Sequence, residues 1–369
     1  MFVSLIVIIL ILVFGYIYST GFERNSNRNR RNYIKLISFL LILQSGLRNV
    51  AVGSDTYQYL QRFLTTKNSS WLQLFQDFFL YYKLGIGKDP GYSILEKIFQ
   101  IFITNYQLWL LFIAILFFYA LGRFIYYNTS KISHAVVAYV TYSVLFFSFF
   151  SITGHRQTIA TAIILLCFEL IKKRNFFLFL FWVLIASTIH KSVMIFIPFY
   201  FIGTFKKFKL INIISLLIFP VGILLRNELF GILKIFGLYE NFEIYEGAGT
   251  FTFTLMYLLI SVVALIRLKY ISSLSINSKY YYNALSLGLL LLPLTWVNPS
   301  AMRVVQFFSI FILILIPFII ESFKVYSVKI KSAARLFFIF LMIIVFVRAN
   351  IDFEYKFFWQ EMSLGDNYN

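Results

Sequence analysis

The chain has 369 residues, of which 60% are hydrophobic and only 13% charged, about half the charged fraction of a soluble domain. Long apolar runs recur from end to end, which indicates an all-α, polytopic integral membrane protein forming a single domain over residues 1–369. The formal charge of +18 would suggest nucleic acid as the partner of a soluble protein. Here the basic residues gather in membrane loops, so we expect a lipid bilayer and no nucleic acid as the partner.

Apolar runs of helical length predict about twelve transmembrane helices. In chain order they cover 2–20, 33–47, 104–121, 132–150, 153–171, 175–190, 192–205, 210–225, 250–267, 280–297, 303–320 and 335–349. Two connecting segments are long, 48–104 and 226–249. The first contains two segments with amphipathic helical spacing, 71–82 and 92–102, which we expect to lie in the membrane interface.

Loop charges predict the orientation of these spans. Alternate loops carry 20 of the 33 basic residues but only three of the 15 acidic residues, and such loops face the cytoplasm under the positive-inside rule. Twelve spans then put both termini outside. The same rule makes 48–104 and 226–249 extracytoplasmic loops, and we expect the functional site on the outer face of the membrane.

The sequence also excludes several kinds of chemistry. Its one cysteine, Cys167, lies in an apolar run, so an intrachain disulfide, a cysteine-rich zinc site and an iron–sulfur cluster are excluded. A glycine-rich phosphate loop, H-E-x-x-H and G-x-S-x-G are all missing from the sequence, which argues against nucleotide chemistry. We expect no metal and no cofactor.

Polar residues gather beside span ends on the predicted outer face. They are Arg48, Asp55, Tyr59, Arg62, Asp89, His155, Arg156, Gln157, His190 and Arg303. If residues 55–62 are helical, Asp55, Tyr59 and Arg62 share one face of that helix. These side chains are then expected to line one cavity, because ionisable groups at the edge of a membrane are costly and usually functional.

Arginine presents a planar fork of donors that suits phosphate, and Arg156 lies in the first turn of a span, where the helix dipole also attracts an anion. We therefore expect Arg156 to bind an anion at the lipid boundary. The alternative is that each arginine reaches to lipid phosphates or pairs with Asp55, Asp89 or Glu228. His190, at the end of another span, is a candidate general base, and a hydrogen-bonded structural histidine is the alternative.

Four short motifs, in order between Arg48 and Pro198, resemble those of the EpsG/Wzy-type polysaccharide polymerase family. Arg48 followed by Gly53-Ser-Asp55 and then Tyr59 resembles the family's opening. The other three are Asp89-Pro-Gly91-Tyr92, Arg156-Gln157-x-x-Ala160 and His190-Lys-Ser192. The chain departs from the pattern at Asn49-Val-Ala-Val, at His155 and at Ile189, and none of these changes removes a polar group.

The resemblance implies an enzyme that joins undecaprenyl-pyrophosphate-linked oligosaccharide repeat units into capsule, exopolysaccharide or O-antigen chains outside the membrane. A chain-length regulator or another polysaccharide-assembly protein is an implied partner. We expect a metal-independent, inverting glycosyl transfer in which Arg156, with Arg48 or Arg303, binds pyrophosphate. Asp55 or His190 would activate the acceptor, and the sequence does not choose between them.

Two other classes of protein use similar residues. A flippase or transporter of lipid-linked oligosaccharides is expected to carry charges near the middle of its spans, whereas the predicted spans here are nearly free of charge there. A membrane glycan acyltransferase would also use histidine and arginine. A deletion strain discriminates among them: single units accumulate outside without a polymerase, units stay inside without a flippase, and unacetylated polymer forms without an acyltransferase.

Overall fold

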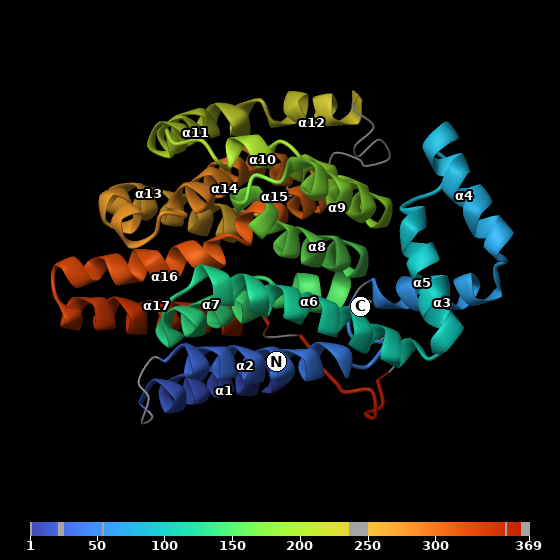
Figure 1. Ribbon diagram of the computed structural model, residues 1–369, viewed down its shortest axis with the longest axis horizontal. Coiled ribbons are helices and arrows are strands. Elements are labelled where there is room, and N and C mark those ends of the chain that lie inside the picture. The colour runs from blue at the N-terminus through green and yellow to red at the C-terminus, as the bar shows by residue number, and fades with distance from the viewer. Residues whose placement is uncertain (1, 21–25, 54, 236–249, 351–352, 363–369) are drawn as a thin grey trace. The chain divides into compact units, whose positions relative to one another are not determined.

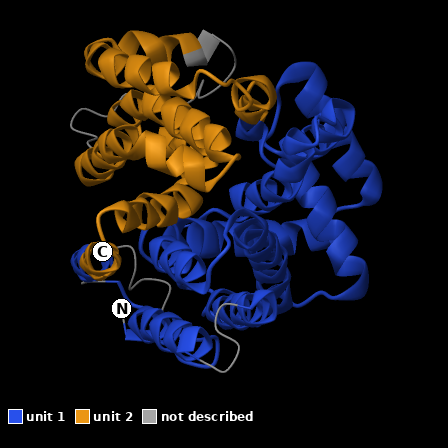
Figure 2. Ribbon diagram, turned by 60° about the vertical axis from the view of Figure 1, so that its left-hand side comes forward, with its two compact units in different colours: residues 1–193, 338–369 blue, residues 194–337 orange. Residues whose placement is uncertain are grey.

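The computed structural model describes residues 2–20, 26–53, 55–235, 250–350 and 353–362, and within these ranges the chain is helical (Figure 1). The expected all-α class is confirmed. The chain divides into two compact units, residues 1–193 with 338–369, and residues 194–337 (Figure 2). Part of the predicted loop 226–249, from residue 236 onward, lies outside the described residues.

The first unit contains the N-terminal helices. They are α1 (Phe2–Thr20), α2 (Asn27–Gly46), α3 (Thr56–Asn68), α4 (Trp71–Leu84), α5 (Pro90–Phe102), α6 (Tyr106–Asn128), α7 (Ile132–Leu145), the π-helix η1 (Phe147–Thr153), α8 (His155–Lys172) and α9 (Phe176–Ile189). Side-chain caps set several helix starts: Ser26, Ser70, Asn105 and Asn175 each accept a backbone N–H two or three residues into the helix, as expected of these residue types.

Helix packing in the first unit follows a chain of neighbours. Helix α2 packs on α6, α6 on α8, and α8 on α9, while α3 and α4 pack on α5 and α5 on α9 (Figure 1). Small residues allow the close approaches, as is common between membrane helices. At Gly122 of α6, for example, a Cβ would lie 2.7 Å from the hydroxyl oxygen of Ser38 on α2.

The second unit contains the C-terminal helices. They are α10 (Phe199–Ile202), α11 (Phe208–Leu224), α12 (Arg226–Ile235), α13 (Phe251–Leu274), α14 (Ser278–Leu291), η3 (Leu292–Trp296), η4 (Pro299–Ala301), α15 (Met302–Ser309), α16 (Ile312–Ser322) and η5 (Phe323–Val325). Two helices join the units in sequence, η2 (Lys191–Phe196) and α17 (Val328–Ala349). Within this unit α14 packs on α11, α13, α15 and α16.

Four helices of the described chain, α1, α6, α13 and α17, are long and apolar enough to cross a membrane, and up to seven spans result if each of three bent pairs is one span. One such pair is α7 with η1, which bend by 65°. Several other predicted spans are short helices, such as α9 and α14 with 14 residues each, and a straight span needs about 20. The apolar helices therefore support a membrane bundle, and the number twelve stays a prediction.

Residues near both ends of the described chain contact the same end of α2. The Gln44 amide donates to the hydroxyl of Ser4, at the start of α1, at 2.9 Å. The backbone carbonyl of Gln44 accepts a hydrogen bond from the hydroxyl of Tyr355, in the C-terminal tail. The position of both termini outside the cytoplasm stays a prediction.

Reporter fusions test that orientation. Alkaline phosphatase fused after Asn369 is expected to be active, because this enzyme matures only outside the cytoplasm, whereas the same fusion after Lys207, in a basic loop, is expected to be inactive. Activity of each fusion, normalised to its amount in the membrane, is the measurement. Low activity at Asn369 with high activity at Lys207 would show the opposite orientation.

Candidate functional site

The Asp89 carboxylate joins three helices of the first unit. Asp89 precedes α5, and its Oδ2 accepts a hydrogen bond from the Arg156 guanidinium of α8 at 2.8 Å. The Nδ1 of His190, at the end of α9, lies 3.5 Å from the same oxygen. The other oxygen, Oδ1, accepts the backbone N–H of Lys191 at 3.1 Å. A motif from each of three separate sequence segments therefore meets at one carboxylate.

Local backbone geometry brings Asp89 to this position. Its φ of 48° is left-handed, a conformation that aspartate tolerates better than most residues, and Pro90 then starts α5. The next residue, Gly91, is in close contact with α9: a Cβ there would lie only 2.6 Å from the Cβ of Thr188. The sequence Asp-Pro-Gly thus turns the chain, starts the helix and allows α5 to approach the end of α9.

The Asp89 side chain is buried, and its charge depends on its neighbours. Burial alone raises the pKa of a carboxyl group. Here His190, Arg156 and the Lys191 N–H outweigh that effect and hold the pKa of Asp89 below its ordinary value. Asp89 is therefore a carboxylate at neutral pH.

A second set of polar residues surrounds His155, which begins α8. The buried Arg48 guanidinium contacts the Nε2 of His155 at 2.7 Å and donates to the carbonyl oxygens of Ser45 at 2.6 Å and Ile152 at 3.2 Å. Because arginine can only donate, Nε2 of His155 must accept, so this ring is neutral. The ring also stacks on Tyr59 of α3, with centroids 4.1 Å apart.

Two further arginines join these sets. The Arg156 guanidinium lies 5.8 Å from the ring centroid of Tyr59. Arg62 of α3 donates to the hydroxyl of Ser93 at 2.9 Å and to the backbone carbonyl of Asp89 at 3.1 Å. We call Arg48, Tyr59, Arg62, Asp89, His155, Arg156 and His190 the Asp89 cluster.

The C-terminal tail forms backbone hydrogen bonds with the residues on either side of Arg48. Residues 48 and 357 form an isolated antiparallel bridge. The N–H of Asn49 donates to the carbonyl of Lys356 at 2.8 Å, and the N–H of Phe358 donates to the carbonyl of Leu47 at 2.9 Å. The end of the chain is thus part of the wall that holds the cluster.

Positive charge exceeds negative charge in the Asp89 cluster. Its three arginines face one ionised carboxylate, which leaves an excess of two positive charges among groups that are mostly shielded from water. Moreover, Nε of Arg156 is buried without a hydrogen-bond partner in the described part of the chain. An anionic ligand would balance the charge and satisfy such a donor.

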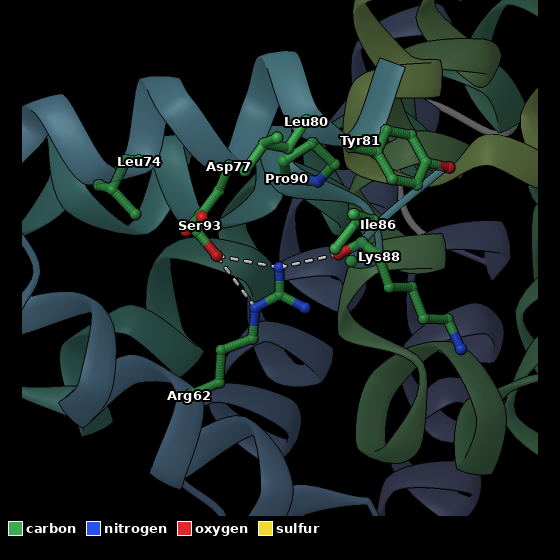
Figure 3. Close-up of a pocket in the computed structure, with 10 residues that line it drawn as sticks. Arg62, Leu74, Asp77, Leu80, Tyr81, Ile86, Lys88, Pro90 and Ser93 are labelled. Atoms are coloured by element: carbon green, nitrogen blue, oxygen red, sulfur yellow. Dashed lines mark hydrogen bonds between the residues drawn. The ribbon is translucent and has the colours of Figure 1, made fainter. Parts of the chain in front are cut away.

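A cavity of about 380 Å³ lies beside the cluster, between α3, α4 and α5 (Figure 3). Arg62, Lys88, Pro90 and Ser93 line the side nearest Asp89. Figure 3 shows the Arg62 guanidinium bonded to Ser93 and to the backbone at Lys88. The cavity and the carboxylate of Asp89 are therefore separated by the short segment 88–90.

A model of the EpsG family matches residues 31–360. The chain belongs to the EpsG family. This confirms the resemblance carried by the four motifs, and it indicates a membrane protein of polysaccharide biosynthesis with a glycosyltransferase-like polymerase activity. Searches of curated proteins and of solved structures found no match.

Seven of the ten site residues expected from the sequence of this EpsG-family chain form the Asp89 cluster. The helix expected from residue 55 onward is present as α3, and Tyr59 and Arg62 both reach the cluster from it. Asp55 is half-buried at the start of α3, one turn before Tyr59. Gln157 is buried next to Arg156. Arg303 lies in α15 of the second unit, and its place in the site stays a prediction.

Sequence reasoning missed Glu96 as a buried part of this region. Glu96 is fully buried on α5, its Oε2 accepts a hydrogen bond from the hydroxyl of Thr66 at 3.3 Å, and the adjacent Tyr92 accepts one from Trp109 at 3.2 Å. Burial raises the pKa of Glu96 to about 8, although Arg62 opposes the shift. The spacing of Tyr92, Glu96 and Gln100 places all three on one helix face, and this was the available signal.

Glu96 predicts a specific dependence of stability on pH. An acid whose pKa is raised by folding stabilises the fold below its unfolded pKa of about 4.5, and this contribution is lost as pH rises through about 8. Glu96→Gln keeps the shape without the charge, so its melting temperature in detergent is expected to exceed that of the wild type at pH 9 and to match it near pH 5. Each pKa unit corresponds to about 1.4 kcal/mol. At pH 9 we therefore expect Glu96→Gln to raise the free energy of unfolding by a few kcal/mol.

Glu354→Gln provides the control for loss of a negative charge, because the Glu354 side chain is half exposed in the tail. An equal difference between wild type and Glu96→Gln at both pH values would contradict the assignment of a buried, protonated Glu96.

Proposed function

We propose that this protein is a polymerase that joins undecaprenyl-pyrophosphate-linked oligosaccharide units on the extracytoplasmic face of the bacterial cytoplasmic membrane. The family supports the polymerase class, and the Asp89 cluster supports the chemistry. The observation that carries the proposal is the junction of Arg156, His190 and Asp89, which combines an anion-binding cation with a histidine held by a carboxylate.

In the proposed reaction the growing chain is the donor. A hydroxyl oxygen of the acceptor sugar attacks the anomeric carbon of the donor, the bond from that carbon to the pyrophosphate oxygen breaks, and the configuration inverts. The leaving pyrophosphate takes the bonding electrons, and the hydroxyl proton passes to a base. Pyrophosphate is already a good leaving group, so the protein mainly needs to stabilise the charge that develops on it.

Arg156 is the group that we assign to the pyrophosphate. One of its N–H groups holds Asp89, Nε has no partner in the described residues, and guanidinium offers five donors in all. The guanidinium can therefore bind a phosphate oxygen while it keeps its contact with Asp89. Arg156 also lies in the first turn of α8, where the helix dipole favours an anion.

His190 is the base that we favour over Asp55. Its Nδ1 faces Asp89, so Asp89 can orient the ring and stabilise the imidazolium that forms when Nε2 takes the proton. Asp55 lies at the start of α3, where its backbone carbonyl accepts a hydrogen bond from the Tyr59 N–H.

Arg48 takes a positioning role in this mechanism. Only 2% of its surface is exposed, and its donors contact two backbone carbonyls and His155. It therefore fixes the ring of His155, on which Tyr59 stacks beside Arg156. Arg303 remains the candidate second arginine for pyrophosphate, and a chain-length regulator remains the expected protein partner.

Loss of the Arg156 guanidinium is expected to slow polymerisation. Arg156→Ala removes a preorganised charge at the leaving group, and the loss of one such donor typically lowers the rate by about 100- to 1000-fold. Purified protein in lipid nanodiscs is incubated with one defined undecaprenyl-linked repeat unit, and product ladders are quantified over time.

Arg174→Ala is the matched control, because Arg174 is an exposed arginine in the turn at the opposite end of α8. It is expected to give wild-type ladders. Wild-type ladders from Arg156→Ala at equal protein levels would remove Arg156 from the mechanism, and no ladder from the wild type would overturn the proposed function.

Paired substitutions test the choice of base. His190→Gln is expected to lower the rate by about 100- to 10,000-fold, because general-base catalysis contributes that much, whereas Asp55→Asn is expected to change it less than about tenfold. The rate of the wild type should also fall on acidification as the base becomes protonated, and His190→Gln should lose this dependence. A severe loss of rate in Asp55→Asn would assign the role of base to Asp55 if His190→Gln still lost activity on acidification.

A further inference from the structure

The cavity beside the Asp89 cluster has its own set of chemical groups. Its volume of about 380 Å³ lies within the range of small-molecule sites. Helix α4 contributes Leu74, Asp77 and Tyr81, and the turn after it contributes Ile86. Arg62, Lys88 and Ser93 complete the polar part of the wall (Figure 3).

The position of the cavity relates it to the reaction. Its wall includes Lys88 and Pro90, the residues on either side of Asp89. Arg62 donates to the backbone carbonyl of Asp89 at 3.1 Å, while the carboxylate of Asp89 contacts Arg156 at 2.8 Å. A molecule in the cavity would therefore lie directly behind the segment that presents Asp89 to Arg156 and His190.

The groups in the wall select among the parts of a lipid-linked oligosaccharide. Lys88 also lines the cavity, but its side chain extends away from Arg62 and Asp77 (Figure 3). A phosphate is disfavoured, because the Asp77 carboxylate repels it and Arg62 already donates to Ser93 and to two backbone carbonyls. An isoprenoid chain is disfavoured, because it would leave the charges of Asp77 and Arg62 without compensation. A neutral sugar suits the wall: carboxylate and hydroxyl groups bind its hydroxyls, and Tyr81 with Leu74 packs against its C–H face.

We propose that this cavity is a subsite for a sugar of the repeat unit and that Asp77 and Tyr81 determine which sugar is accepted. Asp77 accepts hydrogen bonds from sugar hydroxyls, and the Tyr81 ring covers the apolar face of the sugar. This inference rests on the proposed function for its substrate class, while the binding of a sugar in the cavity can be measured without catalysis.

The first test removes the acid. Asp77 is exposed on α4, so Asp77→Ala should leave the fold intact, and Gln76→Ala, at the exposed neighbouring position outside the cavity wall, is its matched control. The probe is the free oligosaccharide released by mild acid from the lipid-linked repeat unit, with its dissociation constant measured by titration calorimetry. Asp77→Ala loses hydrogen bonds to a charged group, so we expect it to bind the oligosaccharide at least about tenfold more weakly than the wild type. Gln76→Ala is expected to bind it like the wild type.

The second test fills the cavity. Ile86 lines it and is 58% exposed, so Ile86→Trp adds volume with little cost to the fold. Phe79→Trp, on α4 and 67% exposed away from the cavity wall, is the control. Ile86→Trp is expected to raise the apparent KM for the lipid-linked unit by about tenfold with kcat nearly unchanged, because a lost binding contact affects ground and transition states alike.

The outcomes separate this inference from the proposed function. Wild-type ladders, with wild-type KM and oligosaccharide affinity in both Asp77→Ala and Ile86→Trp, would overturn the sugar subsite and leave the polymerase intact. Oligosaccharide binding that depends on Asp77, in a protein that makes no ladder, would support the subsite and overturn the polymerase. Displacement of the oligosaccharide by farnesyl pyrophosphate, which carries no sugar, would assign the cavity to the lipid and overturn the subsite.

Discussion

The contact between the Asp89 carboxylate and its three partners is the constraint on which the site depends. A buried carboxylate is stable only with good partners, and removing one partner of such a pair is usually more costly than the pair is worth. Arg156, His190 and the Lys191 N–H are those partners. Because they come from α8 and from the end of α9, the charge of Asp89 fixes the relative position of three helix ends.

The ionisable groups around Asp89 carry a net positive charge. Glu96 lies on the same helix as the Asp89 turn, but burial raises its pKa to about 8, so at neutral pH it adds little negative charge. The Asp89 cluster therefore keeps an excess of positive charge, which its one carboxylate does not cancel. Mutual repulsion among these cations is unfavourable, and the pyrophosphate of the proposed substrate would relieve it. The charge of the cluster therefore supports the proposed pyrophosphate site over one for a neutral ligand.

Local patterns predicted much of this arrangement, and contacts distant in sequence account for the rest. Amphipathic spacing predicted helices α4 and α5, and the i, i+3 spacing of Tyr59 and Arg62 predicted that both reach one site. The sequence did not reveal that Arg48 turns inward to His155, because that depends on the Ile152 carbonyl of the π-helix η1. Nor did it reveal that the C-terminal tail contacts α2, since Tyr355 and Gln44 are 311 residues apart.

The alternatives for Arg156, an anion site or an ion pair with an acid, turn out to be compatible. Arg156 pairs with Asp89, and its Nε can bind a phosphate oxygen of the proposed pyrophosphate while that pair persists. The phosphate would neutralise part of the charge of the guanidinium, so Arg156 would balance less of the charge of Asp89 and His190 would balance more of it. Asp89 would then stabilise an imidazolium at His190 more strongly. Binding of the leaving group would thereby strengthen the base, which couples donor binding to activation of the acceptor.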